Sequence, residues 1–182
     1  MNKTNISKEQ WFSEALNVLQ SGGIESVRVE RLAARLNTSR SGFYWHFENR
    51  DDLLSSLLKY WTKEYTEVVT LGLTETESDP LKRLYLTTDM VRKYKLAKYD
   101  LPIRTWALND TLAKRAVTKV NNIRVNYSRS IFSEFGFSGE DLEMRARLFA
   151  CYVTWEIPMY GPMPNNKWVE QRNLRLQMLT NK

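Results

Sequence analysis

The apolar residues of this chain recur at helical spacing along almost its whole length. Phe12, Ala15, Leu16 and Leu19 stand at positions i, i+3, i+4 and i+7, which places them on one face of a helix. Later segments repeat this spacing, and no stretch of the sequence has the sustained two-residue alternation and hairpin turns of β-strands. The pattern predicts an all-α protein of about nine helices.

Helix start and stop signals divide the first fifty residues into three segments. Ser7 with Gln10 forms a capping box before the first helix, and the pair Gly22 and Gly23 stops that helix. The expected second and third helices are short and cover 29–36 and about 40–46.

A longer helix follows, and we expect it to connect two domains. Its apolar stripe runs from Leu54 to Val68, which predicts a helix over about 50–71. The polar residues 72–79 then predict a break in the chain. The remaining helices are expected at about 80–97, 101–109, 110–135, 139–157 and 166–180.

The composition fits a folded intracellular protein. With 182 residues, of which 42% are hydrophobic and 26% charged, the chain can bury a core and is too apolar to be disordered. Its first residues lack the apolar core of a signal peptide, and its longest apolar run, 148–153, is too short to span a bilayer. We therefore expect a cytoplasmic protein with no membrane partner. The single cysteine, Cys151, allows no disulfide within the chain, and we expect a buried thiol.

Positive charge gathers in one part of the sequence. The chain has a formal net charge of +6, which favours a polyanionic partner. Four arginines and a single acid give the stretch from residue 28 to 46 a local charge of +3, and these residues are Arg28, Arg31, Arg35, Arg40 and Glu30. The function is therefore sought first in this stretch.

The basic stretch has the form of a helix-turn-helix. Two short helices are joined by a tight turn in which Asn37 is suited to the left-handed conformation, and in such units the second short helix enters the major groove of DNA. At the start of that helix, Arg40 has donors for a guanine edge or a phosphate, and Ser41 can donate or accept. Gly42 allows the backbone to come close to DNA. This arrangement predicts sequence-specific binding to double-stranded DNA.

The segment VERLAARLNTSRSGFYWHFENRDDLL resembles the DNA-binding signature of the tetracycline-repressor (TetR) family. The resemblance covers about the first 55 residues, in a specific order, and rests on Leu32-Ala33, Ser39, Gly42, the Tyr44-x-His46-Phe47 run and Arg50, where the family usually has Lys. Two positions depart from the family pattern. Asn37 stands where Gly is usual, and Arg28 stands where Thr or Ser usually caps the second helix.

The resemblance implies a dimeric bacterial regulator, usually a repressor, whose recognition helix reads DNA. By resemblance and by residue chemistry, the DNA-binding candidates are Arg28, Ser39, Arg40, Ser41, Gly42, Tyr44, Trp45, His46 and Arg50. Phe43 and Phe47 are expected in the core, whereas Arg31 and Arg35 fit either DNA contact or a solvated helix face. The expected DNA-binding domain covers 1–50.

The expected second domain, 51–182, combines ligand sensing with dimerisation. Its candidate ligand residues are Met90, Tyr94, Trp106, Tyr127, Tyr152 and Trp155, each of which core packing also explains. Arg104 or Arg124 could pair with an acidic ligand or lie on the surface. The last two helices are the dimer surface by resemblance, with apolar groups on Phe149, Tyr152, Val153, Trp168, Val169, Leu176 and Leu179.

The sequence as a whole predicts a transcriptional regulator, a ligand-responsive repressor that binds a palindromic operator as a homodimer and responds to an unknown small-molecule effector. An enzyme is not expected, because phosphate loops, nucleophile elbows and metal-spaced His or Cys clusters are missing from the sequence. No cofactor is implied either. The alternative is a helical module that binds nucleic acid non-specifically and acts through protein contacts, which predicts steep salt dependence with little sequence preference.

Overall fold

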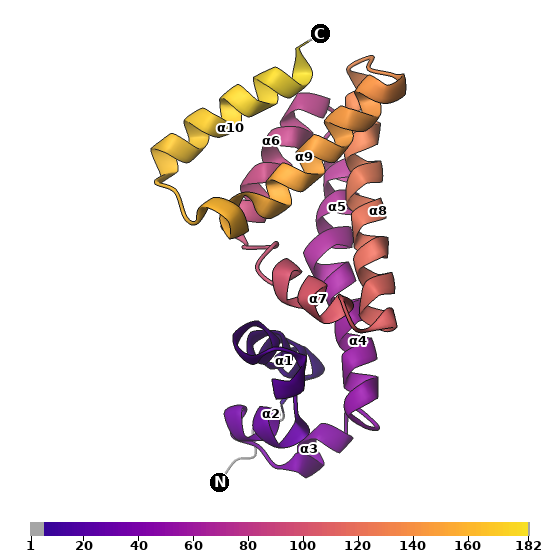
Figure 1. Ribbon diagram of the computed structural model, residues 1–182, viewed down its shortest axis with the longest axis vertical. Coiled ribbons are helices and arrows are strands. Elements are labelled where there is room, and N and C mark those ends of the chain that lie inside the picture. The colour runs from indigo at the N-terminus through magenta and orange to yellow at the C-terminus, as the bar shows by residue number, and fades with distance from the viewer. Residues whose placement is uncertain (1–5, 182) are drawn as a thin grey trace. The chain divides into compact units, whose positions relative to one another are not determined.

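The computed structural model describes residues 6–181, and these residues form helices and no strand (Figure 1). The elements are α1 (Lys8–Gly22), η1 (Ile24–Ser26), α2 (Val29–Arg35), α3 (Arg40–Tyr44), α4 (Arg50–Thr62), η2 (Lys63–Glu67), α5 (Val68–Thr76), α6 (Pro80–Lys93), α7 (Asp100–Ala107), α8 (Thr111–Glu134), α9 (Gly139–Tyr160) and α10 (Asn165–Thr180). Because α4, η2 and α5 follow one another without a gap, they count as one helix, and the described residues then form the nine helices expected. The all-α prediction is confirmed.

The chain divides into two compact units. The first contains residues up to 63 together with 99–118, and the second contains 64–98 and 119–182. The first unit thus extends past residue 50 and includes α7. Residues 1–5 of the predicted N-terminal domain, and Lys182 of the second, lie outside the described residues.

The ends of α1 follow the predicted signals. The Ser7 side chain accepts a hydrogen bond from the Gln10 N–H at 3.3 Å, and the Gln10 side chain accepts one from the Ser7 N–H at 2.8 Å. This reciprocal pair satisfies two donors that the first turn of a helix leaves free. At the other end, Gly23 has φ of 71°, a conformation that residues with a Cβ rarely adopt. The predicted capping box and stop signal are both confirmed.

Aromatic side chains fill the core of the first unit. Trp11 of α1 and Trp61 of α4 are fully buried, and Trp11 meets the ring of Phe43 edge-on with centroids 5.4 Å apart. Each such side chain contributes about 1.5–3 kcal/mol through burial. Tyr99, just before α7, donates a hydrogen bond to the Asn17 side chain at 2.8 Å. The core therefore joins α1, α3, α4 and the start of α7.

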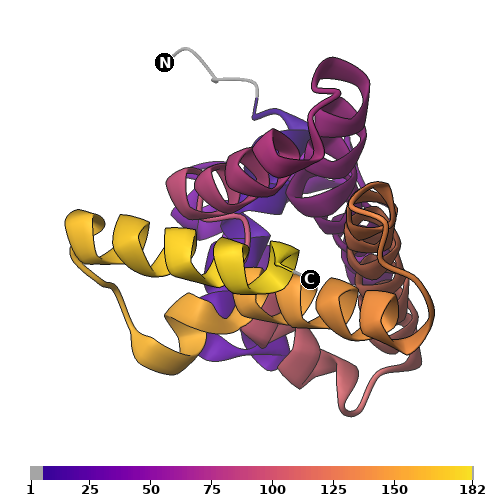
Figure 2. The same ribbon diagram turned by 90° about the horizontal axis from the view of Figure 1, so that it is seen from above.

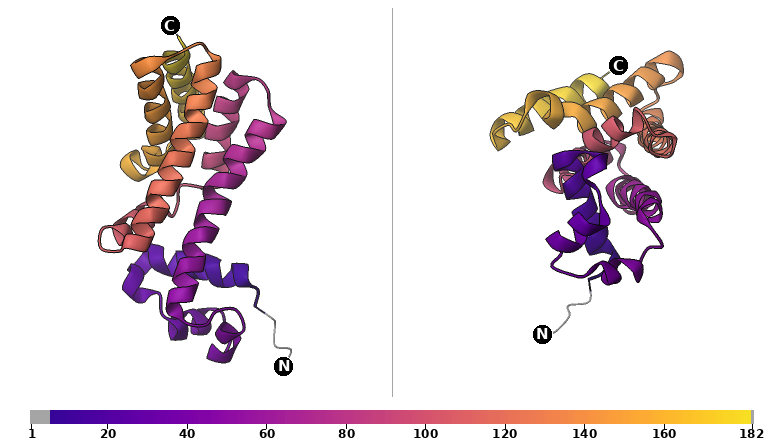
Figure 3. Two further views of the ribbon diagram at one scale, coloured as in Figure 1. Left: turned by 90° about the vertical axis from the view of Figure 1, so that its right-hand side faces the viewer. Right: turned by 60° about the horizontal axis from the view of Figure 1, so that its bottom comes forward.

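The second unit is a bundle whose helices run alongside one another. The α5 and α6 helices lie antiparallel across a short turn, as the left view of Figure 3 shows. The α9 and α10 helices also lie side by side (Figure 2), and Arg145 of α9 donates to the carbonyl of Leu179 near the end of α10 at 2.7 Å. Leu84, Ile131, Phe132, Ala146 and Phe149 are among the fully buried residues of its core.

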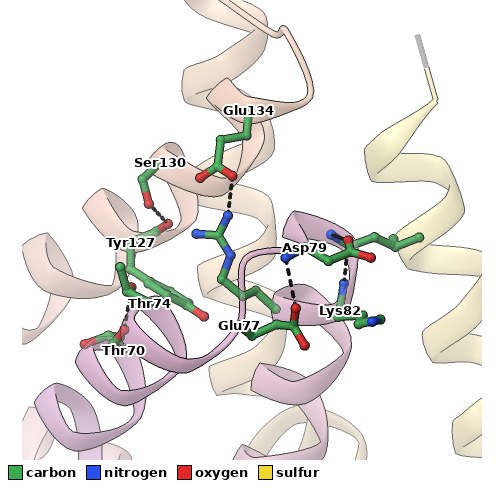
Figure 4. A network of polar contacts seen from close by, with 10 residues as sticks. Thr70, Thr74, Glu77, Asp79, Lys82, Tyr127, Ser130 and Glu134 are labelled. Atoms are coloured by element: carbon green, nitrogen blue, oxygen red, sulfur yellow. Dashed lines mark hydrogen bonds and ion pairs between the residues drawn. The ribbon is translucent and has the colours of Figure 1, made fainter.

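The polar break predicted over 72–79 is mostly helical, so that prediction is wrong. The α5 helix continues to Thr76, and Leu73 is buried on its inner face. The threonines fit the helix because their hydroxyls bond to carbonyls one turn earlier, as Figure 4 shows for Thr74 and Thr70 at 2.7 Å. Only residues 77–79 leave the helix, and Asp79 then caps α6 by accepting from the N–H of Leu81 at 2.8 Å.

No helix within residues 6–181 has the length and apolar character needed to cross a membrane.

Candidate nucleic-acid interface and ligand cavity

The turn between α2 and α3 is tight and is set by Asn37. This residue has φ of 50°, and the following N–H of Thr38 donates to the carbonyl of Ala33 at 2.9 Å. Asn tolerates the left-handed region better than most residues with a Cβ. The prediction for Asn37 is confirmed, and the turn places α3 directly after α2 in a helix-turn-helix.

Two phenylalanines anchor the second helix of this motif. Phe43 is fully buried and Phe47 nearly so, as expected, and their rings lie 5.1 Å apart. Phe47 also contacts Phe12 of α1, with a centroid distance of 5.6 Å. Because one face of α3 is fixed in the core, the residues on its other face are held at the surface.

The exposed face of α3 presents a cation and two aromatic rings. The Arg40 side chain is 67% exposed, and Trp45, just after the helix, is 87% exposed. Tyr44 is exposed too. An exposed Trp and Tyr beside a cation are unusual for a free surface and suit contact with another molecule. The predicted contacts Arg40, Tyr44 and Trp45 are thus free to meet DNA.

Arg40 is paired with an acid of the preceding helix. Its guanidinium lies 3.1 Å from the Glu30 carboxylate. The pKa of Glu30 is lowered from its usual value, first by hydrogen bonding to its own backbone N–H and then by Arg40. Both side chains are largely exposed, so the pair is weak and can open when a phosphate or base competes for the guanidinium.

Three other predicted contacts bind the protein's own main chain. Arg50 donates from Nε to the carbonyl of Val27 at 2.6 Å and from a terminal nitrogen to the carbonyl of Ile24 at 2.8 Å. His46 Nε2 lies 2.7 Å from the carbonyl oxygen of Ile6. Arg28 donates to the carbonyl of Glu25 at 2.9 Å. These bonds give Arg28, His46 and Arg50 a structural role in the first unit.

Ser39 and Gly42 complete the predicted set. Ser39 occupies the N-cap position of α3 without a cap bond, and its hydroxyl lies 2.7 Å from that of Ser41. A Cβ on Gly42 would lie 3.1 Å from the Thr38 hydroxyl oxygen. This contact is tight, and the Thr38 side chain would have to shift slightly to accommodate it. The structure therefore brings Ser39, Arg40, Ser41 and Gly42 together at the start of one helix.

The second unit contains a cavity that is partly open to solvent. Apolar side chains form one part of its wall, namely Val69, Val91, Leu96, Ala97, Phe149, Ala150 and Val153. Hydroxyl groups form another part, from Tyr65, Thr66, Thr70, Thr87, Tyr127, Ser128 and Thr154. Among these lining residues the only charged one is Arg124. A lining that combines apolar side chains with a few polar groups is typical of small-molecule sites.

Arg124 crosses the cavity wall from α8. Its two terminal nitrogens donate to the hydroxyl of Thr66 at 3.2 Å and to that of Thr154 at 3.3 Å. Thr66 belongs to η2 and Thr154 to α9. The guanidinium thus links three segments of the second unit.

Tyr127 is the one predicted ligand residue on the lining. Its hydroxyl lies 2.9 Å from that of Thr87, and burial raises the pKa of its phenol. The neighbouring bond from Ser130 to its carbonyl is visible in Figure 4.

The other predicted ligand residues lie elsewhere in the chain. Trp106 is buried in the first unit, Met90 packs against the core of the second, and Tyr94 is exposed. Tyr152 donates to the Glu156 carboxylate at 3.1 Å, and Trp155 is half-buried on α9 outside the lining. The spacing of apolar residues could not identify the threonines and the serine that line the cavity, because these residues are polar and do not add to an apolar helix face.

Several residues predicted at a dimer surface are buried within their own unit. Phe149, Leu176, Leu179 and Trp168 are at most 8% exposed, so these four predictions are wrong. The sequence pattern marks the apolar face of each helix, and that face covers the unit's own core. The apolar residues left exposed on α9 and α10 include Met144, Leu148, Ile157, Met159, Leu174 and Met178.

Cys151 is exposed, contrary to expectation. It follows Leu148 by three residues on α9, so the two share the outer face of that helix. No group of three or more His, Cys, Asp or Glu side chains within residues 6–181 is arranged to hold a metal ion.

Comparison with known proteins gives the first unit a family likeness. Residues 12–57 match the profile of the family described as bacterial regulatory proteins, tetR family. The chain is 39% identical over 57 residues to the class C tetracycline repressor of Escherichia coli, and 31% identical over 61 residues to the class G protein of Vibrio anguillarum. These matches cover 31% and 34% of this chain and only 25% and 29% of the two repressors. The chain therefore matches about a quarter of their length.

Solved structures extend the likeness in fold to nearly the whole chain. A transcriptional regulator from Rhodococcus sp. Rha1 has a TM-score of 0.72 at 17% identity, with 96% of this chain and 94% of that one covered. AibR in complex with isovaleryl coenzyme A and operator DNA has a TM-score of 0.69 at 16% identity, with 95% and 97% covered. FadR from Bacillus subtilis in complex with stearoyl-CoA has a TM-score of 0.69 at 17% identity, with 96% and 98% covered. At this identity the likeness concerns the fold.

Proposed function

We propose that this chain is a regulator of the tetR family, whose profile its residues 12–57 match, and that it is a ligand-responsive repressor that binds a palindromic operator as a homodimer. The family is one of DNA-binding regulators and not of enzymes. We propose two domains for this cytoplasmic protein. Residues 1–50 bind DNA, and residues 51–182 bind the effector and form the dimer.

The observation that carries the proposal is the outer face of α3. Arg40 and Tyr44 of α3, and Trp45 just after it, are exposed, while Phe43 anchors the other face of the helix in the core. Arg can bond bidentately to guanine in the major groove, and hydroxyl and indole donors can meet phosphates. Ser41 is exposed beside Arg40 and adds a donor and an acceptor. This face supplies both base-reading and backbone-positioning groups.

Dimerisation follows from the way such a motif reads DNA. One short helix covers only a few base pairs, and a two-fold dimer doubles that contact by placing two recognition helices on half-sites. The exposed apolar groups of α9 and α10 support a dimer surface on these helices, because a free surface of this kind is unfavourable in water.

The cavity of the second unit supports the sensing role. Two of the solved neighbours are complexes with acyl-CoA molecules, namely AibR with isovaleryl coenzyme A and operator DNA, and FadR from Bacillus subtilis with stearoyl-CoA. In this chain the proposed effector occupies the cavity around Arg124 and Tyr127. Effector and operator then bind to different conformations of the dimer, so that each weakens the binding of the other.

The test is selection of duplexes from a random pool by the purified protein at one fixed salt concentration. We expect a palindrome to be enriched, and Arg40→Ala to lose or alter that enrichment. Arg115→Ala is the matched control, because it removes the same charge from an exposed residue of α8 and should enrich the same palindrome.

The non-specific module gives a different result in this test. Both variants and the parent protein would then bind all duplexes alike, with a steep dependence on salt. An operator preference of about a thousandfold or more over random duplex supports the specific regulator, and equal binding refutes it.

A further inference from the structure

The basic stretch of residues 28–46 contains a single acid, and that acid lies beside Arg40. Glu30 of α2 accepts a hydrogen bond at 3.1 Å from one terminal nitrogen, Nη1, of the Arg40 guanidinium. The two side chains are 65% and 67% exposed, and an ion pair in such an exposed place adds little to the free energy of unfolding. Stability therefore does not explain why the one acid of this stretch stands at position 30.

A carboxylate at this position is unfavourable for simple attraction to DNA. Phosphates repel it, and it offsets the charge of the arginine beside it. A guanidinium that leaves Glu30 for a phosphate loses one exposed ion pair and gains another, so the net gain is small. Paired with Glu30, Arg40 is therefore poorly suited to a phosphate contact.

The same pair leaves Arg40 well suited to a base contact. The bond to Glu30 engages Nη1 of the guanidinium, whereas the Nε–H and Nη2 groups form a separate fork of donors. This fork can donate to the O6 and N7 acceptors of guanine. A carboxylate has several lone pairs, so Glu30 can also accept from the amino group of a cytosine while it holds Arg40.

Two donors beside an acceptor match the major-groove edge of a G·C pair. That edge presents two acceptors on guanine and one amino donor on cytosine, whereas an A·T pair presents one acceptor on each base with the adenine amino group between them. Resting on the function proposed above, we propose that Glu30 is a specificity-determining residue that reads one G·C pair of each half-site together with Arg40. Arg40 binds the guanine, and Glu30 binds the amino group of the cytosine.

In this arrangement Glu30 raises discrimination between sequences and lowers general attraction to DNA. Its removal releases the Arg40 guanidinium to phosphates, which every duplex offers. Binding to random duplex should then become tighter and more dependent on salt, while the preference for G·C at one position falls. A role in folding alone predicts neither change, because a loss of folded protein weakens binding to all duplexes equally.

The test compares the parent protein with Glu30→Gln, Glu30→Ala and Arg40→Ala. Affinity is measured over a salt series for the enriched palindrome, for random duplex, and for the palindrome with its Arg40-dependent base pair changed to A·T in both half-sites. In the parent we expect that pair to be G·C, preferred over A·T by at least about tenfold. Both Glu30 variants should reduce this preference by at least about threefold. Their slope of log affinity against log salt on random duplex should be steeper by about one.

Glu25→Gln is the matched control, because Glu25 is an exposed acid of η1 in the same unit and its loss removes the same charge. It should keep the preference of the parent at the G·C pair. In the Arg40→Ala background, Glu30→Gln should no longer steepen the salt dependence, because no guanidinium is then released. Circular dichroism checks that each variant folds, as expected for substitutions of exposed side chains.

Three outcomes would overturn the proposal. One is an Arg40-dependent position that is not a G·C pair, and another is an unchanged preference at that pair in both Glu30 variants. The third is an equal weakening of binding to all duplexes. In each of these outcomes the parent protein still enriches a palindrome, so the proposed function stands. A parent protein that enriches no sequence refutes the specific regulator itself, and the assignment of Glu30 with it.

Discussion

The side chain of Arg50 is bonded to two main-chain carbonyls in the segment between α1 and α2. Ile24 is the first residue of the short 3₁₀ turn η1, and its carbonyl also accepts from the Val27 N–H at 3.1 Å, whereas Val27 follows that turn. Arg50→Ala removes both bonds, and we expect a loss of about 2–3 kcal/mol in the free energy of unfolding. Urea denaturation of the variant and the parent protein measures this loss.

Arg31→Ala is the control for this change, because Arg31 is exposed on α2, and its loss should stay within about 0.5 kcal/mol. Equal stability of the two variants would contradict a structural role for Arg50. It would favour instead the phosphate contact that the family resemblance implies for this residue.

Tyr127 makes stability depend on alkaline pH. Burial raises the pKa of its phenol above the ordinary value of 10.0, and the bond to Thr87 only partly opposes this. The folded state therefore favours the neutral phenol. Its contribution to stability is complete below pH 10 and is lost as the pH rises from there through the folded-state pKa. We expect the melting temperature of the parent protein to fall more steeply above pH 10 than that of Tyr127→Phe.

Thermal denaturation from pH 8 to pH 11 checks this expectation. At pH 8 the variant should be less stable by about 1 kcal/mol, the loss of one hydrogen bond. Parallel curves for the two proteins over the whole range would show that Tyr127 does not titrate with folding.

Within single helices, replacing glycine by alanine should have opposite effects on stability at two positions. Gly23 ends α1 with φ of 71°, so Gly23→Ala forces a Cβ into a strained conformation and should cost about 1–3 kcal/mol. Gly72 lies inside α5, where an added Cβ meets no atom within 4 Å. Gly72→Ala should therefore stabilise the protein by about 0.5–1 kcal/mol. Paired thermal denaturation measures both, and a stabilising Gly23→Ala would contradict the strain argument.

The sequence predicted most helix ends but not the π turn. Capping residues act on their nearest neighbours, which is why Ser7, Asn37 and Gly23 could be interpreted directly from sequence. A π turn contains about one more residue than an α turn. After Trp61, the residues that face the core therefore lie one position later in the sequence than a regular α-helix would place them. Thr66 and Val69 are buried, whereas Val68, with which the predicted stripe ends, is exposed. Apolar periodicity assumes one constant period and cannot detect this change.

At the scale of the whole chain, the helix-turn-helix was predictable and the cavity was not. The motif lies within about 25 consecutive residues, and its turn and core residues obey local rules. The cavity brings together residues from α5, α6, α8 and α9, and the spacing within each helix does not say which faces meet. Tyr127 was identified because aromatic residues stand out, whereas Thr66 and Thr154 look like ordinary helix positions.

The exposed apolar residues of α9 and α10 predict how the protein associates. Met144 and Leu148 lie one turn apart on α9, and Leu174 and Met178 do so on α10, with Leu148 50% exposed. In a two-fold dimer each substitution occurs twice, so Leu148→Glu places two unpaired carboxylates in an apolar interface. We expect it to weaken dimerisation by at least about a hundredfold, as measured by sedimentation velocity across a concentration series.

The control is Leu108→Glu, an even more exposed leucine of the first unit, which adds the same charge outside α9 and α10. It should sediment like the parent protein. Operator binding gives a second readout, because a monomer reads one half-site and loses the affinity that the second half-site adds. If Leu148→Glu stays dimeric while keeping its fold, the interface lies elsewhere than on this face of α9. If the parent protein is monomeric at every concentration and still enriches a palindrome, DNA itself must bring the two copies together.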